Sequence, residues 1–206
     1  MASCCEDKAC EIETLRTRQS ATLKLVLAIN TVMFVVEITA GIHSGSVSLV
    51  ADSLDMLGDA LVYGVSMYVV ARGARAKAVA AVGKGSVMAA FGLFVLGQAI
   101  YKLRFPEVPA FEAIGVIGML ALIANVLCLA LLWRHRSDDI NMQSVWLCSR
   151  NDIVANVVVL FAAVGVWSTG SGWPDVLVGL AISALFLRSA VFVLRGSVEQ
   201  LRAGNA

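Results

Sequence analysis

The stretch FEAIGVIGMLALIANVLCLALLW, residues 111–133, is an almost unbroken apolar run. The hydrocarbon core of a bilayer is about 30 Å thick, and a helix needs roughly 20 apolar residues to cross it. The run meets that length. Its hydrophobic residues are continuous and do not alternate with polar ones, which argues against a strand of a membrane β-barrel. The stretch therefore predicts a membrane-spanning helix.

Five further stretches meet or approach the same length, and the six lie at residues 23–42, 47–71, 84–103, 111–133, 143–168 and 174–194. The whole chain has 206 residues, of which 59% are hydrophobic and 15% charged. In a typical soluble domain about a quarter of the residues are charged. We predict an all-α integral membrane protein in which residues 23–196 form a bundle of six transmembrane helices, flanked by short tails at 1–22 and 197–206.

The distribution of lysine and arginine predicts the orientation, because loops rich in these residues stay in the cytoplasm. With the N-terminus inside, the inside segments hold Lys8, Arg16, Arg18, Lys24, Arg72, Arg75, Lys77, Lys84, Arg134, Arg136, Arg195 and Arg202. The outside segments hold only Lys102 and Arg104. Both termini are therefore expected in the cytoplasm, and the protein in the inner membrane if it is bacterial. A net charge of +1 gives no indication of nucleic-acid binding.

Ionisable residues within the predicted spans are few, and such residues tend to face a bundle interior and to mark function. Asp52, Asp55 and Asp59 lie at spacings that place them on one stripe of a helix. Three carboxylates so close together repel one another, so they must be partly protonated, paired with a cation or arranged around a metal. Two interpretations of Asp52 stay open: a helix cap or arginine partner, and a member of a metal-binding stripe.

The predicted helix at 143–168 offers a complementary set of side chains. Cys148 and Asp152 are four residues apart, and Asn156 follows one turn later. If this helix faces the aspartates, Asp55, Asp59, Cys148 and Asp152 converge into a site that suits a tetrahedral metal such as zinc. A thiolate favours zinc or cadmium over magnesium or calcium. The alternative for Cys148 is a small apolar filler between helices.

The spacing of these polar residues resembles that of the cation diffusion facilitator family in two separate blocks. The blocks are Asn30, Glu37, Gly41, Gly45, Ser46, Ala51, Asp52, Asp55 and Asp59, and then Asn125, Asn141, Cys148, Asp152 and Asn156. The resemblance covers the six-helix domain. It implies a divalent metal/proton antiporter, usually a homodimer, with paired ligands on the second and fifth helices.

On this resemblance, Asp55 and Asp59 take the ligand positions of the second helix, and Cys148 and Asp152 those of the fifth. Cysteine stands where histidine is usual, so zinc, cadmium and cobalt all stay open as the transported metal. Asn30, Glu37, Asp52 and Asn156 are expected to support the site or to line the pathway. The family's C-terminal cytoplasmic domain has no room, because the last predicted span ends at residue 194 of 206.

Acid–base chemistry then suggests a mechanism. Metal ligation needs deprotonated carboxylates and thiolate, so metal and protons compete for the same groups. We predict efflux of a divalent metal by alternating access and inward proton flow, with no enzymatic activity and no cofactor. One alternative is a membrane metal sensor or structural subunit. Another is an intramembrane zinc enzyme, which is disfavoured because such sites often use histidine and neither His43 nor His135 lies in a helix core.

The three N-terminal cysteines, Cys4, Cys5 and Cys10, leave two interpretations open. With nearby acidic residues they form a site that captures metal from the cytosol, or they belong to a disordered tail. Adjacent cysteines lack the loop spacing of a zinc knuckle. A reducing cytosol keeps these residues as thiols, so no disulfide framework is expected.

Overall fold

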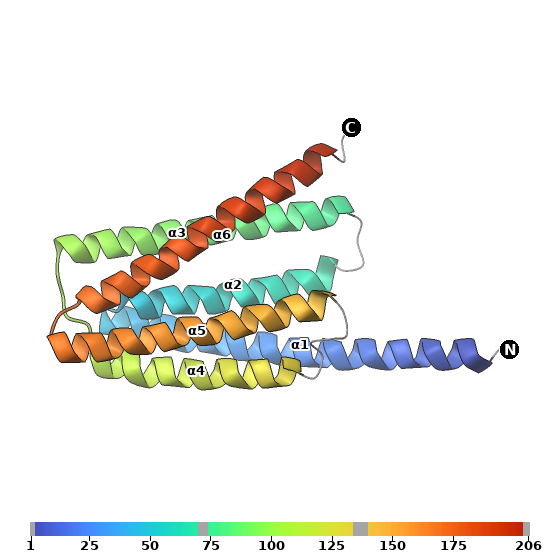
Figure 1. Ribbon diagram of the computed structural model, residues 1–206, viewed down its shortest axis with the longest axis horizontal. Helices are drawn as coiled ribbons and strands as arrows, with labels where there is room; N and C mark the ends of the chain where they lie inside the picture. The colour runs from blue at the N-terminus through green and yellow to red at the C-terminus, as the bar shows by residue number, and fades with distance from the viewer. Residues whose placement is uncertain (1–2, 70–73, 134–139, 204–206) are drawn as a thin grey trace.

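The chain forms six helices and no strand within the residues that the structure describes (Figure 1). The computed structural model describes the backbone of residues 3–69, 74–133 and 140–203, and the side chains of 21–61, 64, 79, 81–133, 149–150 and 152–199. The helices are α1 (Ser3–Ser44), α2 (Val47–Val69), α3 (Ala74–Arg104), α4 (Phe111–Trp133), α5 (Ile140–Thr169) and α6 (Trp173–Ala203).

Helix α4 has the predicted bounds, whereas α1 is much longer than its predicted span. It begins at Ser3, so the polar segment before residue 23 continues the first span as a helix. The physical reason is that no glycine or proline precedes Gly41, and the lysine, arginine, glutamate and leucine residues of this segment are good helix formers. The part of α1 that is apolar enough to cross a membrane is Ala21–Ser44.

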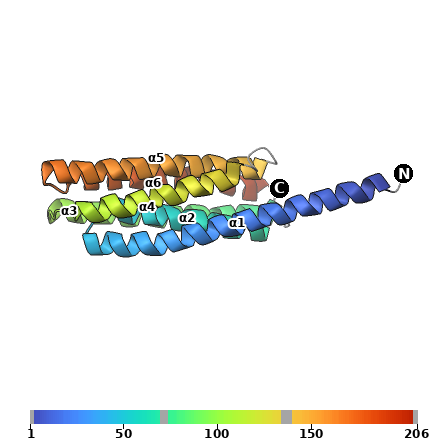
Figure 2. The ribbon, with the colours of Figure 1, turned by 90° about the horizontal axis from the view of Figure 1, so that it is seen from below.

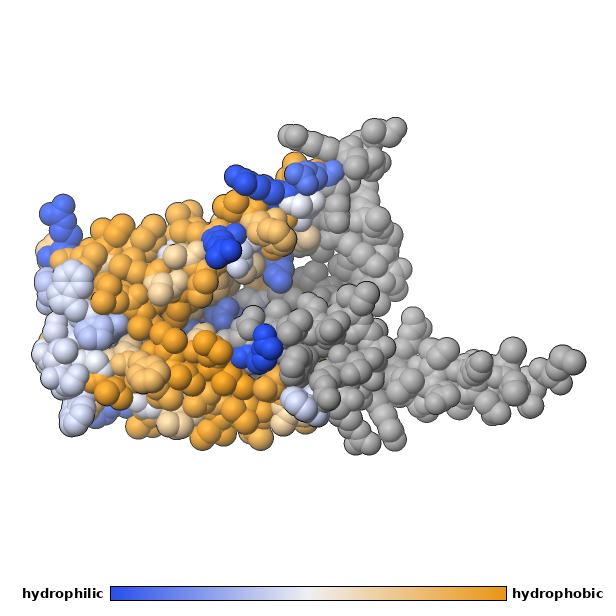
Figure 3. Space-filling view, in the orientation of Figure 1, coloured by the Kyte–Doolittle hydropathy of each residue, from blue (hydrophilic) through white to orange (hydrophobic). Residues whose placement is uncertain are grey.

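Five helices are long and apolar enough to cross a membrane, in the part of the chain that the structure describes. The spans are Ala21–Ser44, Ala81–Arg104, Phe111–Trp133, Asp152–Thr169 and Trp173–Glu199. Helix α2, whose side chains are described at 47–61 and 64, is not among them. Hydrophobic side chains cover much of the described part of the face seen in Figure 3, and Phe192, on α6, is 81% exposed. Such a surface suits contact with lipid.

The helices divide into a pair and a group of four. Helix α3 packs most extensively against α6, while α1, α2, α4 and α5 pack against one another (Figures 1 and 2). The pair is held closely because two glycines of α3 admit leucines of α6. A Cβ atom at Gly92 would lie 2.8 Å from Cγ of Leu187, and one at Gly85 would lie 2.8 Å from Cγ of Leu194. Helix α2 joins the two groups, since it contacts α3 and α6 as well as α1 and α5.

The two chain termini lie at the same end of the molecule, and the α1–α2 and α5–α6 turns lie at the other (Figure 1). We call the latter the loop end. Beneath the turns lies an apolar layer formed by Leu49, Val50, Val159 and Ala163, which belong to one buried hydrophobic cluster. The short α1–α2 turn uses Gly45 at a φ of 70°, a conformation that favours glycine. The three aspartates of α2 lie deeper in the molecule, beyond this apolar layer.

Candidate metal site

Three predicted carboxyl groups come together where α2 contacts α5. Asp152 of α5 has a hydrogen-bonding interaction with Asp59 of α2, and the charges of Asp59, Asp55 and Asp52 all act on it. Two carboxyl groups can share a hydrogen bond only when one of them carries a proton. Asp55, Asp59 and Asp152 are each half-buried. The structure therefore assembles an acidic cluster from two helices whose sequences are about ninety residues apart.

The fourth predicted ligand, Cys148, lies on α5 one turn before Asp152, but its side chain lies outside the described residues. The side chains of Cys4, Cys5 and Cys10, on the N-terminal part of α1, lie outside them as well. Among the described side chains, no three His, Cys, Asp or Glu are arranged to hold a metal ion. Asp55, Asp59 and Asp152 belong to that set and Cys148 does not, so the four-ligand site stays a prediction.

Asp52 has a partner that the sequence did not predict. Asn156 of α5 donates from Nδ2 to both carboxylate oxygens of Asp52, at 3.1 and 3.3 Å. Both side chains are only 1% exposed to solvent, whereas Asn156 Oδ1 has no hydrogen-bond partner. Asp52 is not the cap of α2, since Leu49 N–H donates to Oγ of Ser46 at 3.1 Å. Asp52 and Asn156 therefore form a buried polar pair, one helical turn from the acidic cluster on the side of the loop end.

The two predicted polar residues of α1 are both buried on the same face of the helix. Asn30 donates from Nδ2 to the carbonyl oxygen of Val26 at 3.0 Å, so part of its amide is satisfied by its own helix. Glu37 is fully buried, and neither of its carboxyl oxygens has a hydrogen-bond partner. The charges of Asp52 and Asp55 act on Glu37. Glu37 therefore lies beside the polar stripe of α2, and its part in the pathway stays a prediction.

Two side chains near the acidic cluster were not singled out from the sequence. The charge of Lys84, an exposed residue of α3, acts on Asp55. Cys128 of α4 lies within electrostatic range of Asp152 and Asp59, although it packs in a small apolar cluster with Val26 and Leu132. The sequence does not indicate that Lys84 or Cys128 lies near the cluster, because α3 and α4 approach it only once the bundle has folded.

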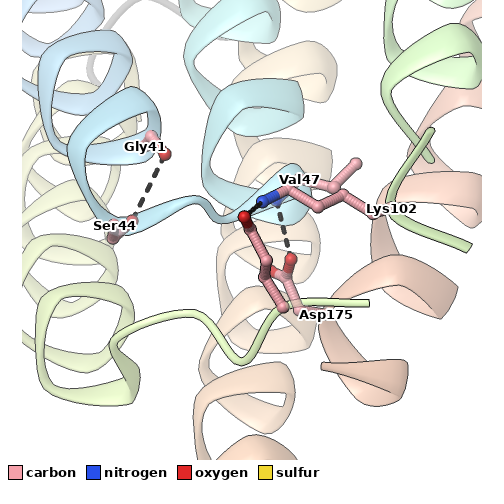
Figure 4. Close-up of polar contacts among 6 residues, drawn as sticks. Gly41, Ser44, Val47, Lys102 and Asp175 are labelled. Atoms are coloured by element: carbon pink, nitrogen blue, oxygen red, sulfur yellow. Dashed lines mark hydrogen bonds and ion pairs between the residues drawn. The ribbon is translucent and has the colours of Figure 1, made fainter. Parts of the chain in front are cut away.

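The most highly connected polar side chain near the start of α2 is Asp175, which comes from α6 (Figure 4). Its Oδ2 accepts a hydrogen bond from Val47 N–H at 2.7 Å. Its Oδ1 accepts bonds from Oγ of Ser46 at 2.6 Å, and from the amide and Oγ of Ser48 at 3.1 and 2.5 Å. An anion at a helix N-terminus satisfies free amides and opposes the helix dipole. Asp175 also lies in the first turn of α6, so one carboxylate stabilises the starts of two helices.

We expect Asp175→Ala to lower the free energy of unfolding by about 2–4 kcal/mol, because it leaves buried N–H and O–H donors without an acceptor. The measurement is thermal unfolding of the purified protein in detergent. Glu112→Ala is the matched control, since Glu112 also lies in the first turn of a helix but is exposed. Helix-dipole interactions at exposed sites contribute about 0.3–1 kcal/mol. Equal losses in the two variants would mean that the buried bonds of Asp175 add nothing to stability.

Comparison with known proteins places this arrangement in a family. Residues 23–202 match the cation efflux transmembrane domain. The cation efflux system protein CzcD of Alcaligenes sp. strain CT14 is 27% identical over 89% of this chain and 62% of its own length. Zinc transporter ZitB of Yersinia pestis is 24% identical over 94% of this chain and 67% of its own. The cadmium, cobalt and zinc/H(+)-K(+) antiporter of Bacillus subtilis is 24% identical, over 88% and 64%.

The chain thus spans about 62–67% of the length of these relatives. The matched region extends from α1 to α6. It contains the acidic cluster, the Asp52–Asn156 pair and Glu37. The resemblance of the sequence to a transporter family is thereby confirmed. This multi-pass membrane protein belongs to the cation diffusion facilitator family.

Proposed function

We propose that this protein moves a divalent transition-metal ion out of the cytoplasm in exchange for protons. The observation that carries the proposal is the convergence of Asp55, Asp59 and Asp152 inside a membrane domain. Carboxylates are costly in a bilayer and are retained there chiefly for function. Support comes also from the relatives, whose names describe the efflux or transport of zinc, cadmium and cobalt.

The proposed cargo site consists of Asp55, Asp59, Cys148 and Asp152. Cys148 precedes Asp152 by four residues on α5, just as Asp55 precedes Asp59 on α2. Residues at this spacing share a helix face. Three carboxylates and one thiolate suit tetrahedral coordination of zinc, and cadmium and cobalt are further candidates.

The burial of the polar residues suggests which side of the membrane the site faces. The three clustered acids are half-buried, whereas Asp52, Asn156 and Glu37 above them are almost completely buried. The apolar layer lies between these three residues and the turns of the loop end. In the proposed arrangement, solvent reaches the cluster from the end that contains the chain termini. We assign that end to the cytoplasm, because the basic residues of the chain concentrate there.

In this arrangement α2 is the sixth transmembrane helix. Its acidic residues meet other helices and not lipid, because α2 packs against α1, α3, α5 and α6. Polar groups at membrane depth are tolerated where protein surrounds them. Six spans place both termini on the same side, as Figure 1 depicts them at the same end of the bundle. We further propose a homodimer, which is the usual assembly in the family.

Proton exchange follows from the chemistry of the ligands. The interaction between Asp59 and Asp152 holds a proton between two groups that would each have to be ionised to bind metal. Metal entering from the cytoplasm displaces that proton. After the site turns outward, protons from the more acidic side release the metal and reset the site.

The proposal is tested with the full chain reconstituted in lipid vesicles that contain a trapped metal indicator. We expect zinc, cadmium or cobalt to accumulate inside the vesicles, faster when the interior is acidic than when the pH is equal on both sides. The physical reason is that outward proton flow supplies the driving force. Vesicles without protein measure leakage, and an ionophore that dissipates the pH gradient is the control for coupling.

Each outcome decides one part of the proposal. Accumulation that does not respond to the pH gradient would contradict proton exchange while leaving metal transport intact. Binding of metal without accumulation of any of the three ions would contradict transport and favour a metal sensor or a structural subunit.

A further inference from the structure

A layer of buried oxygen atoms lies next to the acidic cluster, on the side of the loop end. It is formed by Glu37 of α1, Asp52 of α2 and Asn156 of α5, which are 0%, 1% and 1% exposed. On α2, Asp52 precedes Asp55 by three residues, and on α5, Asn156 follows Asp152 by four. The layer is thus one helical turn from the proposed cargo site on both helices.

The Asp52–Asn156 pair leaves acceptor atoms unused. The amide of Asn156 donates from Nδ2 to both oxygens of Asp52, at 3.1 and 3.3 Å. Its Oδ1 shares a carbon with that nitrogen, so it lies next to the same carboxylate, and it has no hydrogen-bond partner. A carboxylate oxygen can accept more than one hydrogen bond. The pair therefore presents several oxygens with free lone pairs in a fixed arrangement.

Glu37 lies at the same level as this pair. Gly41 of α1 contacts Val50 of α2, since a Cβ at Gly41 would lie 2.8 Å from Cγ2 of Val50. The helices are antiparallel and joined by two residues, so Glu37, four residues before Gly41, lies opposite Leu54, four after Val50. That position falls between Asp52 and Asp55, whose charges act on Glu37. Both oxygens of Glu37 lack a hydrogen-bond partner.

The atoms of this layer that lack a partner are the two carboxyl oxygens of Glu37 and Oδ1 of Asn156, and in the ionised form of Glu37 all three are acceptors. No lysine, arginine or histidine of the described part of the chain contributes to the charges that act on Glu37 or Asp52. Buried polar atoms without partners are rare in folded proteins, and a buried carboxylate is stabilised by pairing or by coordinating a cation. A cation is the group that satisfies carboxylate and amide oxygens from three helices at once.

We propose that Glu37, Asp52 and Asn156 form a second cation-binding site, made of oxygen ligands alone, for a hard divalent cation. Oxygen ligands select hard ions such as Mn²⁺, Mg²⁺ or Ca²⁺, in contrast to a site that contains a thiolate. Leu49, Val50 and Val159 of the apolar layer close this site towards the loop end. The site binds its ion whether or not the ion is carried across the membrane, so the inference does not rest on the proposed transport.

The test is Mn²⁺ binding to the purified full chain in detergent, measured by calorimetry and by the rise in melting temperature that a bound ligand produces. We expect Glu37→Gln and Asp52→Asn each to weaken Mn²⁺ binding by at least about tenfold, as loss of a ligand charge should. The double variant Asp55→Asn/Asp152→Asn removes charge from the cargo site only. It should keep Mn²⁺ affinity within about threefold of the parent, while its Cd²⁺ binding is lost. Glu112→Gln, on the exposed start of α4, is the control for surface charge.

Three results would overturn the second site: no binding of Mn²⁺ by the parent at millimolar concentration, loss of Mn²⁺ binding in Asp55→Asn/Asp152→Asn, or full binding in Glu37→Gln. The melting temperature of each variant without metal is measured first. If Glu37→Gln does not fold, Asp52→Asn decides the matter alone. Failure of the vesicle experiment with Mn²⁺ binding intact would contradict the proposed transport and leave the second site standing.

Discussion

Replacement of Asp55 by asparagine is expected to abolish metal transport in the vesicle assay. Asparagine has nearly the shape of aspartate, but it lacks the negative charge that binds a divalent cation. Loss of a group that only supports a metal ligand costs about 10–100-fold in affinity, so loss of a ligand should reduce transport by at least about 100-fold. Asp152→Asn is expected to have the same effect from α5, because Asp152 interacts with the acidic cluster of α2.

The matched control is Glu112→Gln, which removes the same charge from an exposed position on α4 and should leave the transport rate unchanged. The melting temperature separates loss of transport from loss of fold. Asp55→Asn removes a charge from a half-buried position, so we expect a folded protein. Transport at the parental rate in Asp55→Asn would exclude this carboxylate as a ligand and would leave the convergence of α2 and α5 without its proposed role.

The arrangement of α2 and α5 could be predicted because both helices carry a local pattern. Asp55 and Asp59 are one turn apart, and so are Cys148 and Asp152, so each pair marks the inward face of its helix. The cost of a charge in lipid then requires those faces to meet protein. The structure brings Asp152 to Asp59, as this reasoning requires.

The ends of the helices could be predicted less well, because the length of an apolar run reflects the thickness of the membrane and not the full length of the helix. Helix α3 begins at Ala74, ten residues before its predicted span, and α6 continues to Ala203, beyond the predicted residue 194. Both extensions contain alanine and arginine, which favour helix in water as well as in lipid. A search for apolar spans stops where the charged residues begin, whereas the helical backbone continues through them.

The role of Asp175 could not be read from the sequence at all. Its hydrogen bonds reach Ser46, Val47 and Ser48, which are 127–129 residues away. A cap supplied by the residue just before a helix leaves a local signal, and Ser46 has that signal. A cap supplied by another helix leaves none, because it depends on how α2 and α6 pack. The pairing of Asp52 with Asn156 escaped prediction for the same reason.

Replacement of Cys148 by histidine is expected to change which metal is transported. A thiolate is a soft ligand that favours cadmium, whereas imidazole is a borderline ligand that suits zinc. We expect the ratio of the initial transport rates of cadmium and zinc to fall by about tenfold in Cys148→His, with total activity retained. The measurement is uptake of each metal alone, at equal free concentration, into vesicles with the same pH gradient.

Cys128→Ser is the control that distinguishes the two thiols, because Cys128 also lies near the same acids. It is 1% exposed and packs against Val26 and Leu132, so its sulfur fills apolar space between helices. We expect Cys128→Ser to lower stability but to leave the cadmium-to-zinc ratio unchanged. If instead the ratio changes in Cys128→Ser and not in Cys148→His, the thiolate of the cargo site comes from α4. The proposed ligand set would then be Asp55, Asp59, Asp152 and Cys128.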